Sequence, residues 1–111
     1  MNQSWPREPQ GQELEDLIQL FKALGDTSRM KVLFQIGFSE ACVSEVADKL
    51  NMSESAVSHH LHVLRMNGLV RRRRSGKTIL YAMEDDHVRT IIAQGCKHIE
   101  EFFKARSFIC G

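Results

Sequence analysis

The chain has 111 residues and a formal net charge of only +1, which fits one small domain and excludes a generally basic protein. A domain of this size leaves much of its surface exposed, so a dimer interface would usefully complete its core. No apolar run approaches the roughly 18 residues of a membrane span, and no signal-peptide pattern is present, so no membrane partner is expected. The three cysteines are scattered rather than paired, which predicts a cytoplasmic protein.

The N-terminal third is predicted to contain an arm and two helices. Residues 1–11 carry both prolines and show little periodicity, which indicates a flexible arm. Apolar residues recur at helical spacing from Gln12 to Leu24, and Asp26 or Thr27 can cap a second helix that Gly37 closes. The buried positions expected in this second helix are Met30, Val32, Leu33, Phe34 and Ile36.

The middle of the chain has the outline of a helix-turn-helix. Ser44–Leu50 is predicted to be a short helix, Asn51–Met52 a turn, and Ser53 the N-cap of a longer helix from Glu54 to about Asn67. The inner face of this pair is expected to comprise Val46, Ala47, Leu50, Val57, Leu61 and Leu64.

The outer face of the longer helix is a candidate DNA reader. Its side chains have hydrogen-bonding groups and lengths that suit base edges and phosphates. The candidate DNA-binding residues are Ser53, Ser55, Ser58, His59, His62 and Arg65. A merely solvated helix face is the alternative interpretation.

A β-hairpin is predicted after this helix. Its strands are expected at Leu69–Arg74 and Lys77–Met83, with Ser75–Gly76 as the two-residue loop, because glycine permits the positive φ of a tight turn. Four consecutive arginines begin the hairpin and Lys77 follows its tip, so this wing is expected to lie along the phosphate backbone. The residues expected to contact DNA are Arg72, Arg74 and Lys77; a solvated charged face is the alternative.

The last predicted helix, Asp85–Phe103, combines an apolar stripe with two pairs of candidate metal ligands. The stripe comprises Val88, Ile91, Ile92, Ile99, Phe102 and Phe103. The candidate ligands along its edge are Asp85, His87, His98 and Glu101. The two histidines share a face but lie about 16 Å apart along the axis, so one ion cannot touch both.

Two copies of this helix running antiparallel across a two-fold axis would bring Asp85 and His87 of one chain beside His98 and Glu101 of the other. Two imidazoles and two carboxylates in a tetrahedral arrangement suit zinc, and cobalt would also fit. The alternative is that these four polar residues only form the solvated rim of the helix.

From Leu14 to Phe103 the sequence resembles the ArsR/SmtB family of metal-responsive bacterial transcriptional repressors. The segments that carry the resemblance are LFKALGDTSRMKVL (Leu20–Leu33), SEACVSEVADKLNMSESAVSHHLHVLRMNGLV (Ser39–Val70) and the end of the wing, ILYAMEDDHV. The resemblance implies a mainly α fold with a β-hairpin: a winged helix-turn-helix homodimer whose first and last helices form the interface. It also implies that the four candidate ligands match the family's zinc site in type and spacing.

A second metal site of the family uses positions that Cys42 and Glu45 match. In members with this site, cysteine or histidine residues of the N-terminal arm complete the coordination, and this chain has neither up to Leu24. Cys42 is therefore expected to be a partly buried core cysteine, with an incomplete metal site as the alternative. The clustered cysteines that thiophilic members use are missing from the sequence, so zinc is the first choice, with cobalt or nickel as alternatives.

The resemblance implies repression of transcription. The metal-free dimer would bind double-stranded operator DNA, and zinc would release it to derepress metal efflux or storage genes. One alternative keeps the fold but uses Cys42 and Cys110 as a thiol- or persulfide-responsive pair; another is a DNA-binding dimer that does not respond to metal.

An enzyme is not expected, because four protein ligands close the zinc shell that a catalytic site leaves open. Residues 12–105 are assigned to the DNA-binding and dimerisation domain. Residues 106–111 are assigned to a C-terminal tail.

Overall fold

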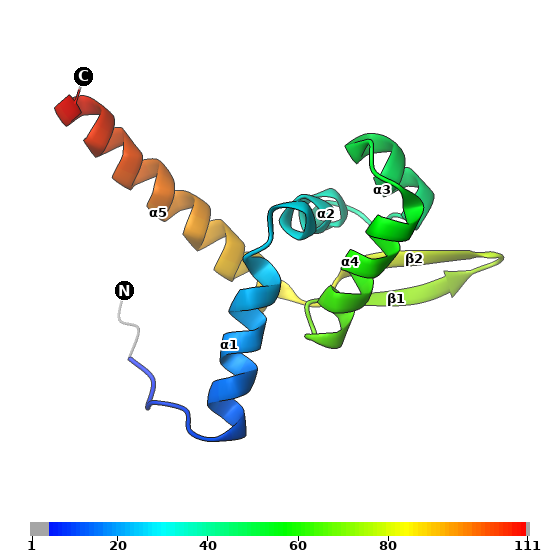
Figure 1. Ribbon diagram of the computed structural model, residues 1–111, viewed down its shortest axis with the longest axis horizontal. Helices are drawn as coiled ribbons and strands as arrows, with labels where there is room; N and C mark the ends of the chain where they lie inside the picture. Colours follow the sequence, from blue (N-terminus) through cyan, green and yellow to red (C-terminus); the bar gives the residue numbers. More distant parts are fainter. Residues whose placement is uncertain (1–4, 111) are drawn as a thin grey trace.

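Five helices and a two-stranded hairpin make up the computed structural model, which describes residues 5–110 and places the side chains of residues 5–104. In chain order the elements are α1 (Gln12–Leu24), α2 (Thr27–Gly37), α3 (Val43–Leu50), α4 (Glu54–Met66), β1 (Val70–Ser75), β2 (Thr78–Met83) and α5 (Asp86–Cys110). This order confirms the predicted mainly α fold with a β-hairpin, and Figure 1 shows α1 and α5 extending away from the other elements. None of the helices within residues 5–110 is long and apolar enough to cross a membrane.

The core lies where α2, α3 and α4 pack on the base of the hairpin. Apolar positions at helical spacing in the helices meet alternate residues of the strands, as the periods of the two structures require. The largest fully buried side chains are Leu33, Ile36, Leu61, Leu64, Leu69, Val32, Val46, Val57 and Val70. The helix-turn-helix and the wing therefore share one core.

Side-chain caps set the starts of α2 and α4. Asp26, rather than Thr27, caps α2, because its Oδ2 accepts a hydrogen bond of 2.9 Å from the backbone N–H of Arg29. Ser53 caps α4 as predicted, since its Oγ accepts from the backbone N–H of Ala56 at 3.0 Å. Each cap satisfies a backbone donor that the helix itself leaves free.

The hairpin loop lies one residue later than the sequence suggested. The strands pair antiparallel from Val70 opposite Met83 to Ser75 opposite Thr78, so Gly76 and Lys77 form the loop rather than Ser75 and Gly76. Gly76 has a φ of 64°, a positive value that glycine adopts without strain at the first position of a two-residue turn. The glycine thus takes the first loop position, and Ser75 stays in the strand.

The apolar faces of α1 and α5 are largely uncovered in a single protomer. Near its start α5 packs on the body through Val88, which is buried, and Ile92, which is partly buried, while Ile99 is 53% exposed. On α1, three of the apolar residues that recur at helical spacing are exposed: Leu17, Ile18 and Phe21. The predicted burial of these stripes therefore requires a second molecule.

Three further expectations about the helices were wrong in detail. Phe34, expected to be buried, is 43% exposed, because α2 turns that side away from the core. The last helix begins at Asp86 rather than Asp85, because Asp85 accepts hydrogen bonds from the first turn as a cap does. It also continues to Cys110, past Phe103 where the apolar stripe suggested its end.

Candidate DNA interface and metal-ligating residues

The outward face of α4 presents the predicted reading residues to solvent. Ser55, Ser58, His59 and His62 are exposed and Arg65 is half-buried, whereas Val57, Leu61 and Leu64 of the same helix are buried. Within residues 5–104, no hydrogen bond to another protein group engages these five side chains. Their polar groups are therefore available to a partner from outside the protomer.

Ser53 has a structural task that differs from the others. Its Oγ holds the N-terminus of α4 by accepting from Ala56, and the residue is exposed. A role in DNA binding stays a prediction for Ser53, and its capping role is what the structure demonstrates.

The four arginines of the wing divide between the two faces of the hairpin. Successive side chains of a strand point to opposite faces. Arg71 donates to the backbone oxygen of Glu84 at 3.0 Å, and Arg73 pairs with Glu40. Arg72 and Arg74 lie on the other face of the hairpin. They share this face with Val70, which is buried in the core.

The predicted DNA contacts of the wing are thus the arginines on the face that packs on the helices. Arg74 donates to the backbone oxygen of Gly76 at 3.1 Å near the tip, and Lys77 is exposed in the loop. The alternation itself could be read from the sequence. Glu40 forms an ion pair with Arg73, and this residue was not identified from the sequence.

Asp85 and His87 lie together at the start of α5. Asp85 Oδ1 accepts from the backbone N–H groups of His87 at 3.0 Å and Val88 at 3.3 Å, while its Oδ2 lies 3.5 Å from His87 Nδ1. Desolvation raises the pKa of Asp85, but the hydrogen bonds from Val88 and His87 outweigh it and leave the pKa below its usual value. The His87 side chain is 93% exposed. One anionic carboxylate and one accessible imidazole therefore stand side by side.

His98 and Glu101 stand further along α5, and both are exposed. The imidazole of His98 stacks on the ring of Phe102, with 6.2 Å between ring centroids. Within the described residues of one protomer, no group of three or more cysteine, histidine or carboxylate side chains converges on one point. The structure of one protomer thus brings Asp85 and His87 together at the start of α5, and His98 and Glu101 lie on later turns of the same helix.

Cys42 is half-buried at the N-cap of α3, which agrees with the expectation of a partly buried cysteine. Its backbone N–H donates to Glu45 Oε1 at 2.9 Å, and its Sγ lies 3.2 Å from Ser44 Oγ. The hydrogen bond from Cys42 lowers the pKa of Glu45. Glu45 therefore has a local role at the helix terminus. The side chain of Cys110 lies outside the described residues, so the proposed thiol pair stays a prediction.

One histidine of α4 points inward rather than outward. His60 Nδ1 is buried and has no hydrogen-bond partner in the described part of the chain. Desolvation lowers the pKa of His60, and the nearby charge of Asp26 partly offsets this. His60 was not singled out from the sequence, although helical spacing separates it from the outward His59 and His62.

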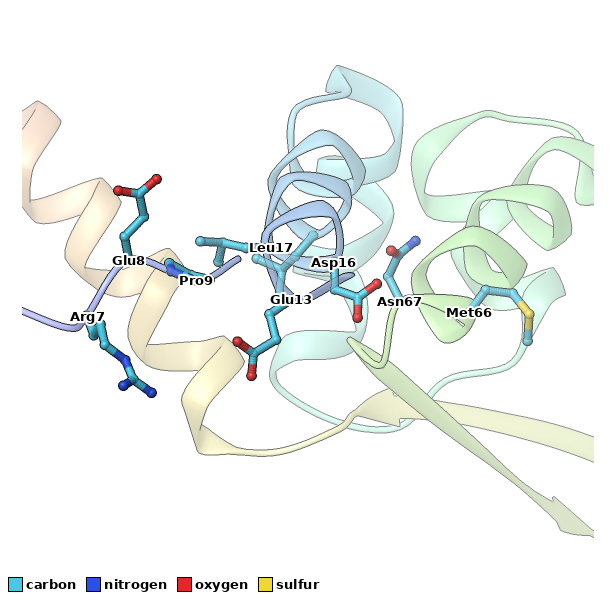
Figure 2. A pocket seen from close by; sticks show the side chains of 9 residues that line it. Arg7, Glu8, Pro9, Glu13, Asp16, Leu17, Met66 and Asn67 are labelled. Carbon is cyan, nitrogen blue, oxygen red and sulfur yellow. The ribbon is translucent and has the colours of Figure 1, made fainter. Parts of the chain in front are cut away.

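A surface groove of about 830 Å³ lies between the N-terminal arm, α1 and the end of α4. Figure 2 shows Arg7 and Glu8 of the arm on one side, Glu13 and Asp16 of α1 in the middle and Met66 of α4 on the other. The groove contains none of the predicted DNA-binding or metal-binding residues.

Comparison with known proteins agrees with this architecture. Residues 26–72 match the family described as bacterial regulatory protein, arsR family. The chain is 33% identical over 87 residues to the cadmium resistance transcriptional regulatory protein CadC homolog of Staphylococcus aureus, an alignment that covers 78% of this chain and 72% of that protein. The chain belongs to the arsR family of bacterial regulatory proteins.

Two other similarities describe this arsR-family regulator further. It is 35% identical over 89 residues to the transcriptional repressor SmtB homolog of Synechocystis sp., covering 80% of this chain and 67% of that protein. Its fold matches the homodimeric winged helix-turn-helix DNA-binding domain of a possible ArsR-family regulator from Mycobacterium bovis, with a TM-score of 0.78, 25% identity and coverage of 83% and 85% of the two chains. The predicted family and the winged helix-turn-helix fold are thereby confirmed, and the relatives are transcriptional regulators rather than enzymes.

Proposed function

We propose that this regulator is a homodimeric repressor that binds operator DNA in its metal-free form and releases the DNA when zinc binds between the two α5 helices. The observation that carries the proposal is the position of Asp85, His87, His98 and Glu101 on α5. They stand as two exposed pairs, one toward each end of an apolar stripe that the protomer leaves largely uncovered beyond Val88 and Ile92.

An antiparallel pair of α5 helices would satisfy both the stripe and the ligands. If His87 of one protomer lies level with His98 of the other, the two-fold axis passes midway between positions 87 and 98, that is, between Ile92 and Ala93. The exposed Ile91 and Ile99 then lie near the partner helix. The same pairing removes apolar surface from water and assembles two four-ligand sites.

The donor set fits zinc. Two imidazole nitrogens and two carboxylates are common zinc ligands, and cobalt accepts the same tetrahedral set. Asp85 can serve the metal and the helix together, because Oδ1 receives the backbone hydrogen bonds while Oδ2 lies on the side of His87. The name of the CadC relative, a cadmium resistance transcriptional regulatory protein, supports a metal as the regulatory signal. Nickel is a weaker alternative, since it favours more ligands than these four.

The release of DNA by zinc follows from linkage between the metal site on α5 and the DNA-binding surface. Two reading helices must lie about 34 Å apart to enter successive major grooves. Ligation across the α5 pair fixes one arrangement of the subunits, and DNA release requires that this arrangement differs from the one that fits the grooves. Because coupling is reciprocal, DNA weakens zinc binding by the same factor, with typical coupling free energies of about 1–3 kcal/mol.

The test measures affinity for operator DNA by fluorescence anisotropy at fixed salt, with and without one zinc ion per protomer. The native protein is expected to lose DNA affinity with zinc. Glu101→Gln and His98→Ala are expected to bind DNA normally without zinc and to lose the response to zinc. Glu100→Gln is the matched control, because it removes a neighbouring exposed carboxylate that the proposed site does not use.

Two outcomes would contradict the proposal. An equal zinc response in the native protein and in His98→Ala would place the metal elsewhere. Equal DNA affinity with and without zinc in the native protein would leave a DNA-binding dimer whose signal is not this metal.

A further inference from the structure

Glu40 lies between α2 and α3, outside every residue assigned to DNA or metal. Its two carboxylate oxygens accept hydrogen bonds from Nε and Nη2 of Arg73, both at 2.7 Å. This bidentate pairing fixes the guanidinium plane as well as its position. Hydrogen bonding to the partner lowers the pKa of Glu40 and raises that of Arg73. The pair is a directed contact between two segments distant in sequence.

The neighbouring backbone strengthens this connection. Ala41 exchanges two hydrogen bonds with Tyr81, at 3.1 Å and 2.9 Å, so it lies alongside β2 as an isolated bridge. The Glu40–Arg73 pair therefore reaches across β2 to β1. Cys42, the next residue after Ala41, occupies the N-cap position of α3. The wing is thus joined to the segment that starts the helix-turn-helix.

The remaining arginines are placed differently. Arg71 is already engaged on the same face as Arg73, since it donates to the backbone oxygen of Glu84. Arg72 and Arg74 lie on the opposite face, and within the described residues no carboxylate pairs with either. The structure thereby distinguishes Arg73, whose charge Glu40 compensates, from Arg72 and Arg74 on the opposite face, although Arg74 also donates to the backbone oxygen of Gly76.

We propose that Glu40 and Arg73 form a positioning pair: they hold the wing in a fixed orientation relative to the helix-turn-helix, so that Arg72 and Arg74 meet DNA phosphates while Arg73 does not. This inference rests on the DNA-binding part of the proposed function and not on the metal response. It assigns Glu40, an acidic residue near a DNA-binding surface, a role that promotes binding.

The salt dependence of DNA affinity separates a positioning residue from a phosphate ligand. Each phosphate contact contributes about 0.9 to the slope of log affinity against log salt, so Arg72→Gln should reduce the slope of the dimer by about 1.8. Glu40→Gln and Arg73→Gln should leave that slope unchanged and lower affinity by about three- to tenfold, since exposed ion pairs have modest energies. The double variant should bind like either single variant, because both changes break the same contact.

Arg73→Lys provides a second discrimination. Lysine keeps the charge but lacks the planar fork that pairs with a carboxylate through two bonds. A positioning role predicts that Arg73→Lys binds as weakly as Arg73→Gln. A phosphate-binding role predicts that lysine largely preserves native affinity.

The experiment uses the full-length dimer and a labelled duplex of about 30 base pairs, long enough for two half-sites one helical turn apart, selected from a random-sequence pool by the native protein. Anisotropy titrations over a range of salt give affinity and slope for each variant. Amide hydrogen exchange provides the structural readout: β1 and β2 should exchange faster in Glu40→Gln and Arg73→Gln, but not in Arg72→Gln.

A fall in slope for Arg73→Gln equal to that for Arg72→Gln would overturn the positioning role, as would native or increased affinity in Glu40→Gln. In either case the native dimer and its Arg72 contact still support DNA binding. If the native dimer selects no duplex at all, the proposed function fails together with the positioning pair.

Discussion

At the residue scale, several polar side chains that DNA or metal could contact already form local hydrogen bonds within the protomer. Asp85 receives backbone hydrogen bonds at the start of α5, Ser53 caps α4, and Glu45 accepts from the start of α3. These contacts orient the same side chains that DNA or metal would use. A substitution at such a residue therefore tests two roles, and the roles separate only when the replacement preserves one of them.

Asp85 offers such a separation. Asparagine caps a helix about as well as aspartate, whereas alanine does not, and asparagine is a poor ligand for zinc. Asp85→Asn is therefore expected to keep the native urea midpoint and to bind zinc at least about tenfold more weakly. Asp85→Ala should lose both zinc affinity and stability. Urea unfolding of the metal-free protein and zinc competition with a chromophoric chelator measure the two effects; native zinc affinity in Asp85→Asn would exclude Asp85 from the site.

His60 predicts a dependence of stability on pH. Its pKa in the folded chain is lowered from the ordinary value of 6.5, so near and below that pH the unfolded chain binds more protons. The stabilising contribution is present above the unfolded pKa and is lost as pH falls through the folded pKa. Between about pH 7.5 and pH 5.5 the native protein should lose more stability in urea unfolding than His60→Gln. Equal losses would show that this imidazole does not contribute.

At the element scale, α4 separates stability from DNA binding along a single helix. Leu61 is fully buried, while the next residue, His62, is exposed on the proposed reading face. The wing then continues from the same core through Leu69 and Val70. The reading surface is thus one side of an element whose other side holds the domain together.

Substitutions at these two adjacent positions should affect different properties: stability at position 61 and DNA affinity at position 62. Leu61→Ala is expected to lower the free energy of unfolding by about 2–5 kcal/mol, because it leaves a cavity in the core. His62→Ala should change stability by less than about 0.5 kcal/mol and weaken operator binding. Urea unfolding and anisotropy titration compare the variants directly; a loss of stability in His62→Ala with native DNA affinity would contradict the assignment of the two faces.

The sequence correctly predicted the starts of α2 and α4, because these depend on neighbouring residues. It did not predict side-chain pairings, because these depend on residues that are distant in the sequence. Ser53 and Asp26 mark helix starts because a cap acts within three residues, and the described helices begin there. The pairing of Arg73 depends on Glu40, which the fold brings to β1 from the segment before α3. The proposed convergence of Asp85, His87, His98 and Glu101 would depend on a second protomer, because these residues stand at two ends of one helix.

At the scale of the whole molecule, the exposed apolar faces of α1 and α5 indicate that one protomer is an incomplete structure. Phe21 on α1 and Ile99 on α5 are about half exposed in one protomer, and a second subunit would cover them. Their burial, the assembly of the metal ligands and the spacing of the reading helices would all depend on the same contact between subunits. Association, zinc binding and DNA binding are therefore expected to fail together when that contact is broken.

Ile99→Glu tests this dependence. A charge in the apolar stripe would have to lose its water on association, so the dimer should weaken by at least about a hundredfold. Thr90→Glu places the same charge at an exposed position on the opposite side of α5, because the nine residues between positions 90 and 99 make about two and a half turns, and it serves as the control. Both variants should fold, because Val88 anchors the start of α5 in the core and neither Thr90 nor Ile99 is buried. Sedimentation equilibrium should show a monomer only for Ile99→Glu, and this monomer should bind zinc weakly and lose most of its operator affinity, since two half-sites can no longer be engaged at once.

A dimeric Ile99→Glu protein with native zinc affinity would show that α5 does not form the subunit interface, and the proposed metal site would fall with it.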